Sequence, residues 1–148
     1  HLRILSAFYG ILKPMDGVTP YRLEMQAKAE IEETTNLYDY WGDRLYHSVI
    51  DDSRTIINLA SKEYSKCIER YLSDKDNYIT ITFCELSGDK LVTKGTYAKM
   101  ARGEMVRFMA ENNIENPVDI QKFDRLGYTF RGNLSSETEY VFERKVIK

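Results

Sequence analysis

The stretch that organises this chain is its first 25 residues, HLRILSAFYGILKPMDGVTPYRLEM. Apolar residues over positions 2–12 fall at helical spacing. They predict a helix that ends before Pro14, because proline disfavours helical geometry in the residue that precedes it. A turn-rich passage follows at 15–20, and residues 21–27 then alternate apolar and polar with period two, as on a half-buried strand. The stretch therefore predicts a helix, a constrained turn and a strand in succession.

The same stretch is rich in polar side chains that we expect to line a cleft. Arg22 and Glu24 fall on one face of the predicted strand, opposite Leu23 and Met25. The alternative is an ordinary surface salt bridge, worth under about 1 kcal/mol when exposed. Tyr9-Gly10, followed by the basic residue Lys13 and by Pro14, also resembles a hairpin whose backbone amides approach an anion. The candidate cleft residues here are Arg3, Ser6, Tyr9, Asp16, Tyr21, Arg22 and Glu24.

The longest predicted helix, residues 97–112, carries a basic face. Gly103 lies four residues after Lys99 and four residues before Arg107, which places all three along one side of the helix. Glycine costs about 1 kcal/mol inside a helix, and at this position it would let a phosphate approach closely. The alternative is an exposed basic face that binds nothing. The candidate phosphate-binding residues are Lys13, Lys99, Arg102, Gly103 and Arg107.

Two further segments contribute candidate cleft residues. Residues 37–50 predict an amphipathic helix within an acidic region, whose carboxylates can equally form a solvated face. Residues 54–59 predict a buried strand that runs into a helix at 62–72, and such a junction leaves backbone N–H groups available to an anion. The alternative is a simple strand–helix connection. The candidates are Trp41, Asp43, Asn58, Ser61 (as the helix cap) and Glu63.

The remaining signals predict an α+β fold, with a mixed β-sheet flanked by helices in a single domain. Residues 78–86 alternate strongly and return through a turn to 90–94, which predicts a hairpin. A short helix is expected from Pro117, and two more strands at 127–130 and 139–144. We expect the core side of the long helix to consist of Tyr97, Ala101, Met105 and Phe108.

Composition narrows the function classes. The chain has 148 residues, 30% of them charged, and a net charge of −2, which argues against a non-specific nucleic-acid grip over the whole surface. Its two cysteines and two histidines have no metal-ligand spacing, so we expect no metal site formed by this stretch alone and no cofactor. No apolar run reaches membrane-spanning length, and we expect no membrane partner. A Ser–His–acid triad lacks a credible histidine.

The motifs resemble those of the bacterial YaaA family of peroxide-stress-resistance proteins. The resemblance begins with LRILSAFYGILKPMDGVTPYRLEM and continues in the same order with LYDYWGD, IINLASKEY, YAKMARGEMVRF and a closing GYTF…YVFER. Family members begin with a portion that carries a Ser-Pro-Ala-Lys segment, which is absent here. We therefore expect this chain to be the C-terminal part of a longer protein.

The resemblance implies a cytoplasmic bacterial protein that protects against hydrogen peroxide by limiting free intracellular iron, with DNA binding as its molecular activity. Two hypotheses follow. In the first, the basic face binds the phosphates of double-stranded DNA or of another phosphate-bearing ligand. In the second, the polar cleft belongs to an enzyme that acts on a nucleotide or nucleobase, with a carboxylate such as Asp16, Glu24 or Asp43 as acid or base. Direct iron binding would need clustered carboxylates. The oligomeric state stays open.

Overall fold

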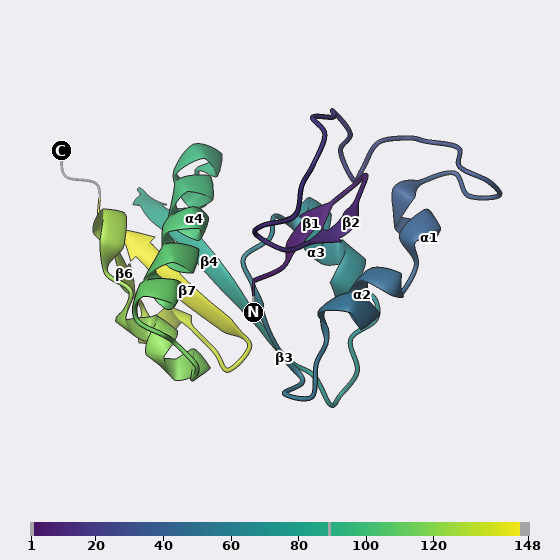
Figure 1. Cartoon of the computed structure of the whole chain (residues 1–148). Helices are drawn as coiled ribbons and strands as arrows, with labels where there is room; N and C mark the ends of the chain where they lie inside the picture. The colour runs from purple at the N-terminus through teal and green to yellow at the C-terminus, as the bar shows by residue number, and fades with distance from the viewer. Residues whose placement is uncertain (1, 89, 146–148) are drawn as a thin grey trace. The chain divides into compact units, whose positions relative to one another are not determined.

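The computed structural model describes residues 2–88 and 90–145. The described residues divide into two compact units (Figure 1). Unit 1 comprises residues up to 56 together with 60–77, and unit 2 comprises 57–59 together with the residues from 78 onward. We describe each unit by itself.

Unit 1 contains a two-stranded hairpin and three short helices. Strands β1 (Ile4–Ser6) and β2 (Gly10–Leu12) pair antiparallel. Helices α1 (Leu37–Trp41), α2 (Arg44–Val49) and α3 (Lys62–Glu69) follow. Strand β3 (Thr55–Asn58) leaves this unit and enters the sheet of unit 2.

The predicted helix over 2–12 is wrong, because the segment forms the β1–β2 hairpin. Ser6 pairs with Gly10, so residues 7–9 make a three-residue loop, and Gly10 has φ +77°. Loops of this length commonly end in a residue with left-handed geometry, which glycine adopts without strain. The side chain of Trp41 packs against Gly10. A contact from a residue distant in sequence thus favours the hairpin over the helix that local spacing indicates.

The predicted strand over 21–27 is also wrong. No strand is assigned to this described segment, and its chain turns where the Ala27 N–H donates to the Glu24 carbonyl at 3.0 Å. The expected alternation of burial is nevertheless present. Met25 is fully buried, whereas Arg22 and Glu24 are exposed. The alternation in sequence therefore indicated correctly which side chains are buried. Among the described residues, however, no strand pairs with this segment through backbone hydrogen bonds.

The helix predicted over 37–50 is interrupted. Gly42 has φ +54° and ends α1, whose first turn is capped by the Asn36 side chain. The chain restarts as α2 two residues later. The predicted strand at 54–59 and the helix start at Lys62 are confirmed, although α3 ends at Glu69, before the expected residue 72.

Unit 2 is built on a mixed sheet with the order β3–β4–β7–β6. The long strand β4 (Asn77–Ser87) runs parallel to β7 (Glu139–Arg144), and β6 (Tyr128–Phe130) pairs antiparallel with β7. The short strand β5 (Lys90–Val92) completes the predicted hairpin with β4. The α+β class with a mixed sheet is therefore confirmed. That the chain is one domain, and the C-terminal part of a longer protein, stays a prediction.

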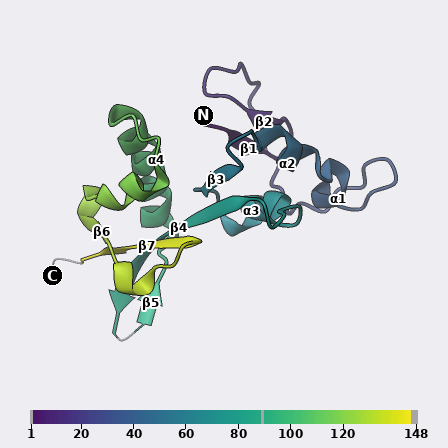
Figure 2. The ribbon, with the colours of Figure 1, turned by 90° about the horizontal axis from the view of Figure 1, so that it is seen from below.

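Helix α4 (Gly95–Glu111) covers one face of this sheet (Figures 1 and 2). Three single-turn or short 3-10 segments complete the unit, namely Pro117–Lys122, Arg125–Gly127 and Gly132–Leu134. The core forms where α4 meets alternate residues of β4 and β7, and it includes Ile81, Phe83, Ala101, Met105, Phe108, Phe123 and Phe142. Tyr97 was wrongly expected in it. The ring is 41% exposed, and Ala98, one residue further along the helix, is buried instead.

Candidate functional site

The basic face of α4 separates into two parts in the structure. Lys99 and Gly103 are exposed, and a Cβ added at Gly103 would meet no atom within 4 Å. Arg102, on the same side of the helix, is half-buried. Within residues 2–88 and 90–145, no carboxylate lies within 4 Å of the charged groups of Lys99 or Arg102. This side of α4 therefore presents two cations beside an open backbone.

Arg102 is the most unusual of these groups. Burial lowers the pKa of its guanidinium, and no neighbouring charge opposes that effect. Its Nε atom is buried and has no hydrogen-bond acceptor in the described part of the chain. Buried polar groups normally have a hydrogen-bond partner, and the Nε of this half-buried cation lacks one. An anion bound here would supply the missing partner.

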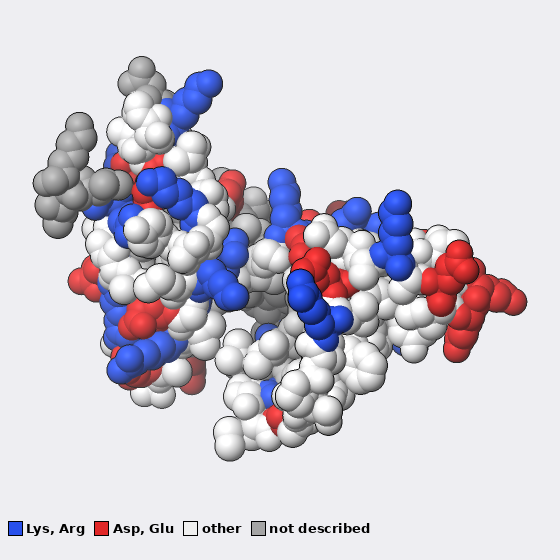
Figure 3. Space-filling view, turned by 90° about the horizontal axis from the view of Figure 1, so that it is seen from above, with Lys and Arg blue, Asp and Glu red and all other residues white. Residues whose placement is uncertain are grey.

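Arg107 lies further along α4 and is neutralised. Its Nε is 2.7 Å from Glu111, and the same carboxylate is 2.7 Å from Arg125. Arg125 also reaches Glu104 at 2.8 Å. These bonds lower the pKa of Glu111, with the hydrogen bond from Arg107 as the largest cause. The face of unit 2 visible in Figure 3 accordingly shows blue and red side chains interspersed.

Four of the predicted cleft residues come together around the β1–β2 hairpin. The hydroxyls of Ser6 and Tyr21 are 2.5 Å apart, and the Tyr9 N–H donates to Ser6 Oγ at 2.9 Å. The Tyr9 hydroxyl accepts from the Thr19 N–H at 2.9 Å. The Trp41 indole N–H donates to the carbonyl of residue 7 at 2.9 Å. The bonds to Tyr21 and Thr19 hold the loop over 13–21 against the hairpin, and the Trp41 bond joins α1 to it.

Three other predicted cleft residues form contacts outside this group. Asp16 accepts from the backbone N–H of Lys13 at 2.7 Å, a bond that shapes the turn. Asp43 lies 3.3 Å from His47 in an exposed pair. Glu63 accepts from the Gln26 N–H at 3.3 Å.

Of the last five candidates, Arg22 and Glu24 line one open pocket together with Leu23 and Ala27. Asn58 is buried in unit 2, and its Nδ2 lies 3.4 Å from Thr80 Oγ1. Ser61 occupies the cap position of α3 without a side-chain cap bond. Arg3 is exposed, and its guanidinium donates to the Leu2 carbonyl at 3.0 Å. Arg22 and Glu24, both among the described residues, form no ion pair with each other.

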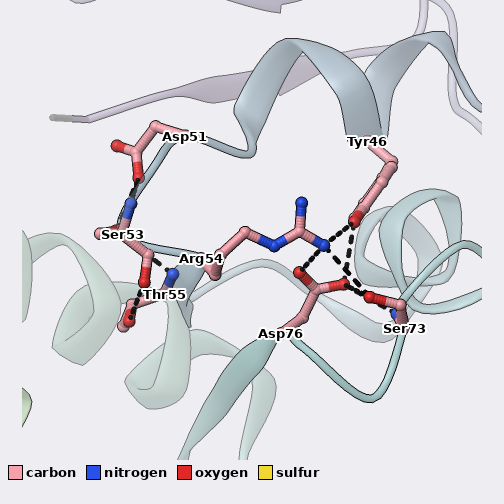
Figure 4. A network of polar contacts seen from close by, with 7 residues as sticks. All are labelled: Tyr46, Asp51, Ser53, Arg54, Thr55, Ser73 and Asp76. Atoms are coloured by element: carbon pink, nitrogen blue, oxygen red, sulfur yellow. Dashed lines mark hydrogen bonds and ion pairs between the residues drawn. The ribbon is translucent and has the colours of Figure 1, made fainter.

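Sequence reasoning missed a partly buried ionic network in unit 1, drawn in Figure 4. Asp76 lies 2.6 Å from Arg54 and accepts hydrogen bonds from the Tyr46 hydroxyl and from the Ser73 N–H, at 2.8 and 2.7 Å. The Ser73 backbone bond is the largest cause that lowers the Asp76 pKa. The network joins α2 to the loop before β4 and is structural. No local spacing indicates it, since its members come from three segments: α2, the residue before β3 and the loop before β4.

A second ionic cluster was also missed, at the end of β4 in unit 2. Glu85 is 1% exposed and lies 2.9 Å from Lys94 and 2.7 Å from Arg144. Arg144 stacks on Tyr97, with its Cζ 3.6 Å from the ring centroid. The hydrogen bond from Lys94 is the largest cause that lowers the Glu85 pKa. Two cations compensate the buried carboxylate, and this explains why Tyr97 stays at the surface, where it covers Arg144.

The described residues hold neither a metal cluster nor a membrane span. Within residues 2–88 and 90–145, no three His, Cys, Asp or Glu side chains gather closely enough to hold a metal ion. None of the described helices has both the length and the apolar character to cross a membrane. Burial raises the pKa of the Cys67 thiol to about 11, so this cysteine is a buried apolar group.

Comparison with known proteins places the chain in a family. A family model described as "Peroxide stress protein YaaA" matches residues 1–134. A UPF0246 protein of Agathobacter rectalis is 80% identical over 146 residues, which is 99% of this chain and 59% of that protein. UPF0246 proteins of Lachnoclostridium phytofermentans and Desulfitobacterium hafniense are each 56% identical, over 96% and 100% of this chain. The chain spans 56% and 59% of those two proteins. By these matches the chain belongs to the YaaA peroxide stress protein family.

Proposed function

We propose that this chain binds double-stranded DNA through phosphate contacts from Lys99 and Arg102 on α4, with Gly103 leaving room for the backbone of the ligand. In this proposal DNA binding serves a peroxide-stress response in which free intracellular iron is limited. The observation that carries the proposal is Arg102, a half-buried guanidinium without a carboxylate partner among the described residues. A phosphate oxygen would satisfy its buried Nε and oppose its charge.

Family membership supports the peroxide-stress part of the proposal, and the geometry of α4 supports the phosphate contact. Lys13, in unit 1, is exposed and stays a predicted second contact. Arg107 also stays a prediction. To bind a phosphate it would have to share or leave the Glu111 carboxylate, 2.7 Å away.

The test is fluorescence anisotropy of a labelled DNA duplex across a salt series. A Lys99→Ala/Arg102→Met variant removes both cations but keeps the aliphatic stem that packs at residue 102. We expect weaker binding and a log–log salt slope flattened by about 0.9 for each phosphate that the variant no longer neutralises. A Lys62→Ala/Lys122→Ala variant is the control, because it removes the same charge from other surfaces.

Stability provides a second readout. Arg102→Met removes a half-buried charge whose Nε has no acceptor, so we expect the free energy of unfolding to stay level or rise while DNA affinity falls. Such opposite changes separate a ligand-binding residue from a structural one. Equal losses of affinity in the double variant and the control would overturn the placement on α4. Absence of wild-type binding at low salt would overturn DNA binding itself and would direct a screen to nucleotides as substrates.

A further inference from the structure

The β1–β2 hairpin of unit 1 is apolar on both of its faces. Its register places Ile4 opposite Leu12 and Leu5 opposite Ile11, and successive residues of a strand point to opposite faces. Ile4 is 43% exposed, and the other three side chains are half-buried. An antiparallel sheet with one face in water alternates apolar and polar residues, whereas apolar residues on both faces are typical of strands that are covered on both sides. The hairpin thus has the composition of an internal pair of strands but leaves part of its apolar surface exposed.

The two ends of the hairpin have different neighbours. At the loop end, Tyr21 places its ring beside that of Phe8, with the centroids 5.4 Å apart and the planes tilted by 32°. The Tyr21 hydroxyl also lies 2.5 Å from Ser6 Oγ. At the open end, Leu2 and Ile4 are 40% and 43% exposed. This end therefore presents apolar side chains at and before the start of β1 for a partner to cover.

Strand β1 also has an open edge. In the described part of the chain the hairpin is a sheet of two strands, so each strand pairs on one side only. A hairpin of two strands is marginally stable by itself, and exposed strand edges are usually protected by charges or proline. The chain beyond β2 reaches Pro14, whose ring nitrogen cannot donate a hydrogen bond, whereas residues 2–6 include no proline and a single charge. The edge of β1 is therefore the one suited to pair with a further strand.

The longer relatives of this chain supply a candidate for that strand. The Agathobacter rectalis protein contains a counterpart of 99% of this chain within only 59% of its own length. About two-fifths of its polypeptide thus lies outside the match and is covalently joined to the matched part. A linked segment has a high effective concentration at the hairpin, and this favours it over a second copy of the chain or a separate protein.

We propose that β1 accepts a β-strand from the portion of polypeptide that the longer relatives carry outside the matched region, and that this portion covers Leu2 and Ile4. The site selects an extended segment with alternating apolar side chains, because backbone hydrogen bonds supply the pairing and alternate side chains reach the apolar face. The inference concerns how unit 1 is completed and does not depend on DNA binding.

The test uses a chimera, the Agathobacter rectalis protein with its matched part replaced by this chain and with a protease site at the junction of the two parts. Hydrogen exchange followed by mass spectrometry measures the backbone amides of the hairpin in the chimera and in the chain by itself. We expect exchange of the amides in residues 2–6 to slow by about tenfold or more in the chimera, because strand pairing protects amides from water.

Cleavage at the junction then measures the association of the two parts. We expect the parts of the wild-type chimera to sediment together as a one-to-one complex. Ile4→Asp should weaken this association by about tenfold or more, because it would bury a charge in the pairing surface. Met15→Asp is the matched control, since Met15 is 94% exposed in the loop after β2. Ile4 is also exposed in the chain by itself, so a urea midpoint near that of the wild type would show that Ile4→Asp still folds.

Equal exchange of residues 2–6 in the chimera and in the chain by itself would overturn the proposal without the use of any variant. Wild-type parts that separate after cleavage, or an association that Ile4→Asp and Met15→Asp weaken equally, would overturn it as well. A dimer of the chain by itself that Ile4→Asp dissociates in sedimentation velocity would assign the hairpin to a second copy and would also contradict it. None of these outcomes bears on α4, so the proposed DNA binding is decided by its own test.

Discussion

Gly10 lies directly against the indole of Trp41. A Cβ at residue 10 would sit 2.9 Å from two ring carbons of Trp41 and 3.3 Å from Leu45, and Gly10 also has φ +77°. The hairpin thus meets α1 and α2 at a point where only glycine satisfies both the packing and the backbone. This contact positions the loop that carries Phe8.

Gly10→Ala should therefore destabilise the protein by about 2 to 4 kcal/mol, from left-handed backbone strain combined with overpacking. Urea unfolding followed by the fluorescence of Trp41 measures the change. Gly17→Ala is the matched control. Gly17 has no neighbour within 4 Å of an added Cβ and no positive φ, so we expect a change within about 1 kcal/mol. Equal urea midpoints for the two variants would show that the contact with Trp41 does not exclude a side chain at residue 10.

Asp76 should make stability fall in acid. Its pKa is lowered from an ordinary value of 3.8, chiefly by the Ser73 backbone hydrogen bond. A carboxyl with a depressed folded-state pKa contributes stability that is present above the unfolded-state pKa and is lost as pH falls through the folded-state pKa. Asp76→Asn should therefore be less stable than wild type at pH 7, with a difference that narrows below about pH 4.

Urea midpoints measured from pH 7 to about pH 3 test this expectation. Asp74→Asn, at an exposed neighbouring position, is the control and should follow the wild-type profile. Glu85 and Glu111 also have lowered pKa values, so some acid sensitivity should remain in Asp76→Asn. A difference that stays constant with pH would refute a titrating role for Asp76.

Glu111 should restrain DNA binding if α4 is the binding face. Its carboxylate holds both Arg107 and Arg125 at 2.7 Å. Glu111→Gln frees Arg107 from its carboxylate partner, whereas Arg125 keeps its bond to Glu104 at 2.8 Å. We therefore expect tighter duplex binding and a salt slope steeper by about 0.9 for each additional phosphate that is neutralised. Glu115→Gln, also exposed in unit 2, removes the same charge without releasing an arginine and serves as control. An equal increase of affinity in both variants would indicate a general charge effect.

The cysteines should be unreactive in the folded protein. Cys67 and Cys84 are both buried, and burial raises the pKa of Cys67 to about 11. Because the thiolate is the reactive form, labelling with a disulfide reagent at pH 8 should be slow for the native chain and rapid in denaturant for both thiols. Free cysteine provides the reference rate. Rapid labelling of the native protein would contradict the burial of these side chains.

The secondary structure of unit 2 was predicted closely from the local pattern of the sequence. The alternation of β-branched and aromatic residues in β4, the turn into β5 and the apolar line of α4 each describe one element that packs on one face. The opening stretch was predicted wrongly, because the spacing of the apolar residues over 2–12 fits both a helix and a hairpin. Packing of Trp41 on Gly10, from 31 residues further along the chain, accompanies the hairpin that is observed. The tilted rings of Phe8 and Tyr21 follow from that same fold.

By itself, the sequence determined the family, the order of elements in unit 2 and the placement of Lys99, Arg102 and Arg107 on one helix. Only the tertiary structure decided which of these cations has a partner. Within α4, Glu111 pairs with Arg107, but Arg125 arrives from a later segment to complete that cluster. Arg102 meets no such group among the described residues and is partly buried. The physical reason is that periodicity encodes the faces of a single element, whereas charge compensation and desolvation depend on the distances between elements.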